Sequence, residues 1–129
     1  MRIIAEAGVY TAPDGGEPND WVVHLSTGDL SLGTYCIPAG GLDDQTPHTE
    51  DEIYVVRSGR ATLKTGPGTA EAGPAEAGTP EVSSAEVGPG SVIFVPAGET
   101  HTFTEVTEDL ALLVFFAPPY GSRAPGSAT

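Results

Sequence analysis

Short apolar runs, separated by turns that contain glycine and proline, make up most of the chain. They predict strands over residues 21–25, 30–37, 53–56, 60–65, 92–95, 102–106 and 110–116. The short link 57–59 predicts a hairpin between the third and fourth of these strands, and residues 107–109 predict a turn between the last two. Because no convincing amphipathic helix is present, we expect an all-β domain of short strands.

The run 110–116 is the most apolar of these segments. It is far shorter than the roughly 18 residues of a membrane span, and its composition suits a central strand that is buried on both faces. The first residues of the chain lack the long apolar stretch of a signal peptide, so we expect a cytoplasmic protein.

Residues 66–90 follow a different pattern, because a five-residue unit is copied there. Glu71, Glu76, Glu81 and Glu86 recur every five residues, a period that matches neither a strand nor a helix. The segment is rich in Gly, Pro and Ala and has little apolar area to offset its ordering entropy. We therefore expect one domain over 1–129, with 66–84 as a low-complexity surface loop and 120–129 as a loose tail.

The charge of the chain limits its partners. Eighteen acidic residues against five Lys and Arg give a formal net charge of −13, which disfavours nucleic acids and anionic membranes as ligands. The single cysteine, Cys36, excludes an internal disulfide and a zinc cluster built from cysteines, and we expect a buried, inert thiol.

Two histidines and a glutamate form the main candidate site. His48 and Glu52 lie four residues apart where the strand 53–56 begins, and His101 opens the strand 102–106 after a Pro-Ala-Gly turn. An imidazole and a carboxylate meet the needs of a divalent first-row metal ion, and two imidazoles with one carboxylate are typical of non-haem Fe(II) sites. The same donors also suit Zn²⁺, Mn²⁺ or Ni²⁺. The simpler interpretation is that both histidines are ordinary polar residues in turns.

Other residues are weaker candidates for a substrate pocket. Tyr35, Tyr54 and Phe103 could equally belong to the core. His24 could be an acid or base that faces a cavity, or a plain strand residue. Glu50 is a further potential metal donor, although a solvated loop acid is the favoured interpretation. The pocket candidates are Gln45, Thr46, Tyr35, Tyr54, Phe103 and His24.

The spacing around these ligand-type residues resembles the two motifs of the cupin superfamily. The chain has Gly40-x5-Thr46-x-His48-x3-Glu52-x6-Gly59, where the first cupin motif reads G-x5-H-x-H-x3-E-x6-G. It then has Gly90-x5-Pro96-x-Gly98-x2-His101-x3-Glu105, where the second motif reads G-x5-P-x-G-x2-H-x3-N. Thr46 replaces the first histidine and Glu105 replaces the final asparagine.

The resemblance implies a double-stranded β-helix, a small jelly-roll barrel, with His48, Glu52 and His101 as metal ligands. The usual fourth ligand of the family is lost at Thr46. Water or substrate could complete the coordination, Gln45 or Thr46 could contribute weakly, or the barrel could bind a small molecule without a metal. Small cupins also pair as dimers through sheet edges, so a homodimer is expected.

These expectations define two candidate functions. The favoured one is a metal-dependent enzyme that acts on a small organic substrate, as a dioxygenase-like oxidoreductase with Fe²⁺. The family also contains isomerases and lyases, and fold alone does not choose among these reactions. The alternative is a barrel that binds or senses a small molecule without catalysis.

Overall fold

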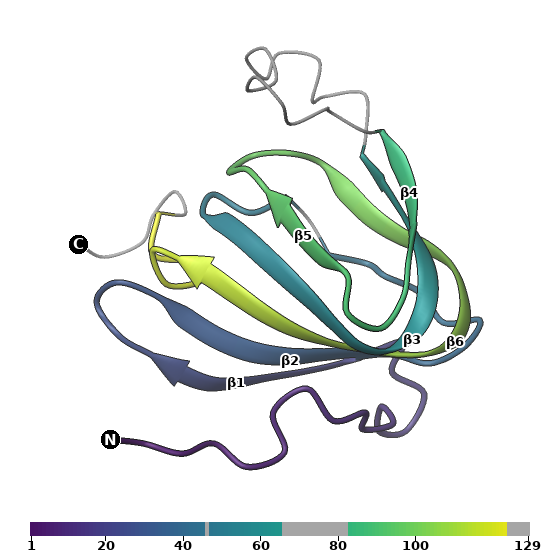
Figure 1. The fold of residues 1–129 in the computed structure, drawn as a ribbon, viewed down its shortest axis with the longest axis horizontal. Helices are drawn as coiled ribbons and strands as arrows, with labels where there is room; N and C mark the ends of the chain where they lie inside the picture. The colour runs from purple at the N-terminus through teal and green to yellow at the C-terminus, as the bar shows by residue number, and fades with distance from the viewer. Residues whose placement is uncertain (46, 66–82, 124–129) are drawn as a thin grey trace.

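The computed structural model describes residues 1–45, 47–65 and 83–123, and this part of the chain contains strands and no helix (Figure 1). It therefore contains no helix that could cross a membrane. The strands are β1 (Asp20–Ser26), β2 (Ser31–Ile37), β3 (Asp51–Thr65), β4 (Ser84–Val87), β5 (Val92–Val95) and β6 (His101–Ala117). The predicted all-β class is confirmed.

The strands form one curled antiparallel sheet. Its order is β1-β2-β6-β3-β4, and β5 pairs with β3 beside this path. Figure 1 shows β3 and β6 as long curved strands, with β1 and β2 on one side and β4 and β5 on the other. The curl closes the apolar faces of the strands around a common interior, which is the jelly-roll arrangement.

The two longest strands differ from the sequence prediction. β3 pairs with β6 from Asp51 opposite Ala117 to Thr65 opposite His101, with register shifts between Val56 and Thr62. The predicted hairpin at 57–59 and the predicted turn at 107–109 are therefore wrong, because both segments lie inside continuous strands. A strand that bends by β-bulges carries the same glycine and polar residues that otherwise indicate a turn.

Gly59 shows why this bend requires glycine. Its φ is +89°, and a Cβ at this position would lie 2.2 Å from the carbonyl oxygen of Asp109 and 2.6 Å from the Cα of Leu110. The backbones of β3 and β6 therefore approach each other too closely for any side chain. The bend allows both strands to pass from one side of the barrel to the other.

Buried side chains form an apolar core inside the barrel. The run 110–116 lies in β6 between β2 and β3, as predicted for a central strand. Alternate residues of these three strands point inward and are almost fully buried. The core includes Tyr35, Ile37, Tyr54, Val56, Leu110, Leu112, Val114 and Phe116.

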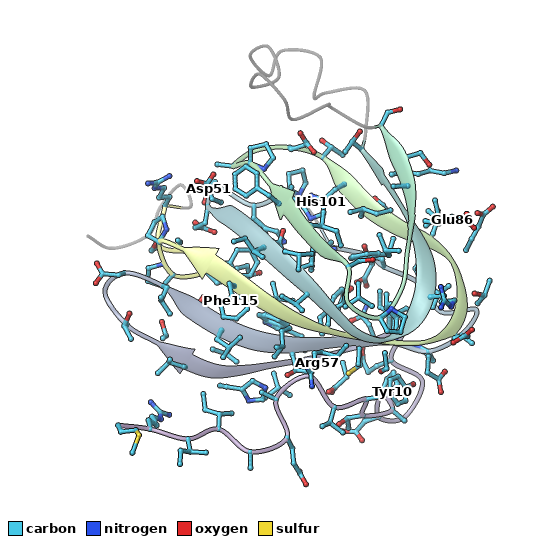
Figure 2. All side chains as sticks on the ribbon, viewed as in Figure 1. Tyr10, Asp51, Arg57, Glu86, His101 and Phe115 are labelled. Carbon is cyan, nitrogen blue, oxygen red and sulfur yellow. The ribbon has the colours of Figure 1, made fainter. Side chains whose placement is uncertain are left out.

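The outer face of β2 is covered by the N-terminal segment. The amide of Gly8 donates to Thr34 Oγ1 at 2.8 Å, and the amide of Thr11 lies 3.4 Å from Cys36 Sγ. Figure 2 shows Tyr10 of this segment and Arg57 on the same side of the sheet. Burial raises the pKa of the Cys36 thiol, which fits the predicted inert cysteine.

The copied segment and the tail are only partly described. Residues 66–82 and 124–129 lie outside the described residues, as does Thr46, so the loop and tail stay predictions there. Ser84 begins β4 and pairs with Lys64, so the framework starts before the last copy of the repeated unit. Residues 120–123 form a turn that is tied to Glu50, as described below.

Candidate metal centre and its cavity

The loops before β3 and β6 bring the three ligand-type residues together. Glu52 is the second residue of β3, His48 precedes this strand, and His101 is the first residue of β6. The amide of Gly98 donates to the carbonyl oxygen of His48 at 2.7 Å, which joins the two loops. The curl of the sheet then places the start of β6 across the barrel from the start of β3.

The donor atoms of this cluster lie close to one another. His101 Nε2 is 3.1 Å and His48 Nε2 is 4.0 Å from Glu52 Oε1, and each of the three residues offers one ligand atom within 4.8 Å of the others. Two donors that share an ion at about 2.1 Å lie about 3 to 4.2 Å apart. A small contraction would therefore place all three on one ion.

Glu52 gives the strongest indication that the cluster binds a cation. The residue is 2% exposed, and within the described residues neither carboxylate oxygen has a hydrogen-bond partner. His101 Nε2 lies 3.1 Å from Oε1, a contact that becomes an ion pair when the ring is protonated. A buried carboxylate without partners is costly, and a divalent cation would satisfy both oxygens. The donor set therefore fits a first-row divalent ion.

The hydrogen bond on the other ring nitrogen of His101 sets its tautomer. His101 Nδ1 lies 2.8 Å from the carbonyl oxygen of Glu99, which only accepts, so Nδ1 carries the proton and the neutral ring turns the lone pair of Nε2 toward Glu52. Burial lowers the pKa of His101, but the Glu52 carboxylate and the Glu99 carbonyl outweigh burial and raise it overall. The negative charge of Glu52, which favours the protonated form of His101, would also attract a metal ion.

His48 is oriented through Gln45. Its Nε2 lies 2.9 Å from Gln45 Oε1, and Gln45 Nε2 donates to Asp43 Oδ2 at 2.9 Å, which fixes the direction of the amide. Because an amide oxygen only accepts, His48 Nε2 carries a proton in this arrangement and would have to release it, together with the contact to Gln45, in order to ligate an ion. Burial lowers the pKa of His48, and the charge of Glu52 offsets this only in part. The ring is therefore held in the neutral form that a metal ligand requires.

Tyr54 closes the inner side of the cluster. Its hydroxyl lies 2.9 Å from His101 Nε2 and 3.1 Å from Gln45 Oε1, and its single proton can be donated to only one of these two acceptors at a time. The side chain is fully buried, and burial together with the charge of Glu52 raises the pKa of Tyr54 well above its ordinary value. A neutral phenol therefore borders the site.

Asp43 is a buried carboxylate that supports the site from behind. It accepts hydrogen bonds from the Tyr35 hydroxyl at 2.8 Å, from the Gln45 side chain, and from the amide of Phe103 at 2.8 Å. Burial and the adjacent Asp43 raise the pKa of Tyr35. This role could not be predicted from the sequence, because Asp43 and Asp44 resemble ordinary turn acids.

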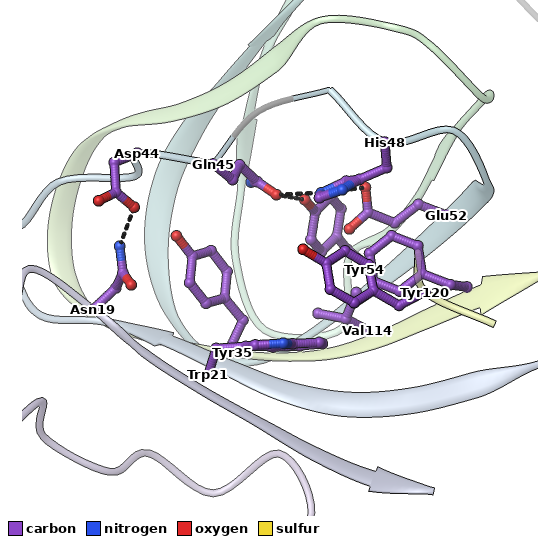
Figure 3. Close-up of a pocket in the computed structure, with 11 residues that line it drawn as sticks. Asn19, Trp21, Tyr35, Asp44, Gln45, His48, Glu52, Tyr54, Val114 and Tyr120 are labelled. Carbon is purple, nitrogen blue, oxygen red and sulfur yellow. Dashed lines mark hydrogen bonds and ion pairs between the residues drawn. The ribbon is translucent and has the colours of Figure 1, made fainter. Parts of the chain in front are cut away.

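A cavity of about 170 Å³ adjoins the cluster (Figure 3). Three of the pocket candidates, Tyr35, Gln45 and Tyr54, line it. The other lining residues are Asn19, Trp21, Asp44, His48, Glu52, Val114, Phe116 and Tyr120.

Two of the predicted pocket residues lie elsewhere. Phe103 packs behind Tyr54 in the core, with ring centroids 5.0 Å apart, and does not line the cavity. His24 Nε2 is 2.6 Å from Thr34 Oγ1 on the outer face of β2. Strand alternation alone could not show which face of β1 carries His24, because the register is set by pairing with β2.

The turn at residues 120–123 contributes Tyr120 to the cavity wall, which the sequence did not predict. Glu50 was expected to be a solvated acid, but it is 2% exposed and accepts from the amides of Gly121 and Arg123, each at 3.1 Å, and from Thr49 Oγ1. Burial alone would raise the pKa of Glu50, but these hydrogen bonds lower it. They place Tyr120 against His48, with ring centroids 5.4 Å apart. Residues 120–123 are therefore anchored, not loose.

Solved structures with the same architecture define the class of this protein. An uncharacterized conserved protein from Klebsiella pneumoniae with a double-stranded β-helix domain is 20% identical, covers 92% of this chain and 90% of its own, and gives a TM-score of 0.68. An RmlC-like cupin from Desulfovibrio desulfuricans is 16% identical over 92% of this chain and 98% of its own, with a TM-score of 0.65. An RmlC-like cupin from Methanocaldococcus jannaschii is 14% identical over 85% and 89%, with a TM-score of 0.61. The fold is the cupin double-stranded β-helix.

A relative in sequence gives the family. The uncharacterized protein SCO3923 of Streptomyces coelicolor is 40% identical over 91 residues, which are 70% of this chain and 72% of that protein. No protein-family model matches the chain. The chain belongs to the same family as SCO3923, and its fold is that of the cupins.

Proposed function

We propose that this cupin is a metal-dependent enzyme that acts on a small organic substrate. His48, Glu52 and His101 would hold a divalent ion, with Fe²⁺ favoured, and the chemistry would be dioxygenase-like. The observation that carries the proposal is the buried Glu52 carboxylate, which faces two imidazoles and has no hydrogen-bond partner among the described residues. Two histidines and one carboxylate suit Fe(II) and leave coordination positions open.

When bound, the ion would supply Lewis acidity and open positions for oxygen and substrate. The residues around it keep the donors fixed. The Glu99 carbonyl accepts from His101 Nδ1 and so sets the tautomer of His101, and Asp43 holds Gln45 beside His48. Such supporting hydrogen bonds hold metal ligands in a productive geometry.

The cavity limits the size of the substrate. Its volume of about 170 Å³ is below the roughly 300 Å³ at which drug-sized pockets begin, so the substrate has only a few heavy atoms. Tyr54, Phe116 and Val114 are among its lining residues, and a substrate that covered them would displace water there, which would strengthen electrostatic interactions.

Metal analysis tests this proposal. His101→Ala and Glu52→Gln should each reduce the bound metal of freshly purified protein at least tenfold, since supporting partners alone are worth 10- to 100-fold in metal affinity. His24→Ala is a matched control, because His24 is the remaining one of three histidines and lies outside the cavity. Unchanged metal content in His101→Ala would overturn the proposal.

A non-catalytic binding barrel is the second candidate. Five of the eleven residues that line the cavity are Trp, Tyr or Phe, and the sequence has Thr46 where the family motif has a fourth ligand. Oxygen uptake by the metal-loaded protein against a panel of small substrates separates the two functions. Ligand-dependent thermal stabilisation without turnover on any member of the panel would favour binding.

A further inference from the structure

Four aromatic side chains form one part of the cavity wall, and two of them, Phe116 and Tyr120, also contact His48. Tyr35 and Tyr120 stand nearly perpendicular to Trp21, at 83° and 74°, with ring centroids 6.2 and 6.0 Å from it. Phe116 meets Trp21 in the same way, at 6.3 Å and 86°. Figure 3 shows Trp21 edge-on, with Tyr35 and Tyr120 on either side and one indole face toward Gln45 and His48. We call Trp21, Tyr35, Phe116 and Tyr120 the aromatic box.

The charges around the aromatic box are negative. Asp44 and Glu52 line the cavity, and the described lining residues include no Lys or Arg. Asp43 and Glu50 are buried just behind it, so the surroundings stay negative even with a divalent ion bound. The whole chain carries a formal charge of −13. This field favours a cationic group and disfavours an anionic one away from the ion.

The aromatic box is a built site and not a chance contact of surface rings. Trp21 lies in β1 and Tyr35 in the paired strand β2, where the two residues are directly opposite each other. Tyr120 is held by the backbone clamp that Glu50 forms with Gly121 and Arg123. Tyr35 is fixed by its hydrogen bond to the buried Asp43. The faces are therefore pre-arranged, which lowers the cost of ordering them on binding.

We propose that the aromatic box binds a small organic cation of the alkylated ammonium class, with the cationic group against the indole face of Trp21. Electron-rich ring faces attract such cations, and the attraction is largest for tryptophan and in desolvated sites. The proposal rests on the proposed function, since it names the class of ligand that the same site accepts. The ion and the aromatic box would then hold opposite ends of one small molecule.

Comparison of a cation with its uncharged isostere tests the proposal. Trp21 is the only tryptophan of the chain, so its fluorescence reports on the aromatic box alone. The metal-loaded protein is titrated with choline and with 3,3-dimethylbutan-1-ol, in which carbon replaces the nitrogen. Choline should bind roughly tenfold more tightly, because only the cation gains from the ring faces and carboxylates. Equal affinities, tighter binding of the alcohol or no binding of choline would overturn the proposal.

Substitutions place the binding in the aromatic box. Tyr120→Leu keeps the apolar bulk but removes a ring face, so choline should bind several-fold more weakly while the alcohol is unaffected. Tyr10→Leu is the matched control, since Tyr10 lies on the N-terminal segment outside the cavity. Trp21→Leu, measured by calorimetry, should lose choline binding by roughly tenfold or more. Unchanged choline affinity in Tyr120→Leu and in folded Trp21→Leu would contradict the assignment.

The failure of this proposal can be told apart from the failure of the metal proposal. Tetramethylammonium has no atom that can ligate a metal, so it should bind the aromatic box before and after treatment with a chelator. Loss of metal binding with retained tetramethylammonium binding would remove the metal proposal alone. Normal metal content with no binding of tetramethylammonium or choline would remove the cation proposal alone.

Discussion

At the scale of single residues, two buried carboxylates differ in what surrounds them. Asp43 accepts from Tyr35, Gln45 and the amide of Phe103, so its charge is satisfied by the protein. Glu52 is equally buried, but among the described residues it has no hydrogen-bond donor and faces two imidazoles. The first arrangement supports the structure, and the second is the arrangement expected of a cation-binding carboxylate.

Replacement of Asp43 should lower stability strongly. Asp43→Ala leaves the Tyr35 hydroxyl, the Gln45 amide and the Phe103 amide without their acceptor, and buried unsatisfied donors cost about 1–3 kcal/mol each. Because partial rearrangement is expected, the free energy of unfolding should fall by about 3 kcal/mol in urea titrations. Asp44→Ala is the control. Asp44 is exposed and accepts only from Asn19 among the described contacts, so its loss should cost about 0.5 kcal/mol. Equal losses in the two variants would contradict this role for Asp43.

The sequence predicted the residues of the candidate site unevenly. His48, Glu52 and His101 could be found because their spacing from glycine and proline turns is visible in the chain. Trp21 and Tyr120 could not, since their positions depend on strand register and on the clamp at Glu50. His24 was placed near the cavity for the same reason, because a one-residue change in register reverses the face of every side chain.

At the scale of strands, the long pair β3 and β6 determines the shape of the barrel. Each was predicted as two short strands around a turn, and each is one strand that bends. Glycine and polar residues near positions 58 and 108 are compatible with either outcome, and local sequence cannot decide between them. The choice is made by pairing along the whole length of the two strands, which is a non-local property.

The bend gives a prediction for two glycines of similar backbone conformation. Gly59 and Gly90 have φ values of +89° and +91°, but only at Gly59 would a Cβ meet backbone, while at Gly90 nothing lies within 4 Å. Gly90→Ala should cost about 1–2 kcal/mol from the left-handed conformation alone. Gly59→Ala should cost at least about 2 kcal/mol more, because β3 and β6 must separate. Equal costs by thermal or urea unfolding would show that the close approach is relieved easily.

At the scale of the whole molecule, the sequence predicts that folding of the barrel does not depend on the copied segment. The amide of Thr65 donates to the carbonyl oxygen of Ser83 at 2.9 Å, so the two ends of the connection already meet. Antiparallel neighbours of this kind can be joined by a short turn. The predicted homodimer stays a prediction, which light scattering of the purified protein would check.

Deletion of residues 70–79, two copies of the repeated unit, should leave the fold intact. Residues 83 and 84 must be kept, since Ser84 pairs with Lys64 in β4. Each halving of the length of a flexible connection lowers the entropic free-energy cost of closing it by about 0.6 kcal/mol. The variant should therefore be as stable as the full chain or slightly more stable. Circular dichroism and thermal unfolding of both proteins would measure this. A variant that is unfolded or clearly less stable would show that the copied segment belongs to the framework.

The clamp at Glu50 also bears on how the protein should be handled. The chain runs from the cavity wall at Tyr120 through the two clamped amides of Gly121 and Arg123, so anything joined after Arg123 begins only a few residues from the ligand site. Affinity tags and fluorescent fusions joined there would disturb the position of Tyr120 in the cavity wall. Attachment at the amino end, which leaves from the opposite face of the sheet, would keep purification and imaging reagents away from the chemistry (Figure 1).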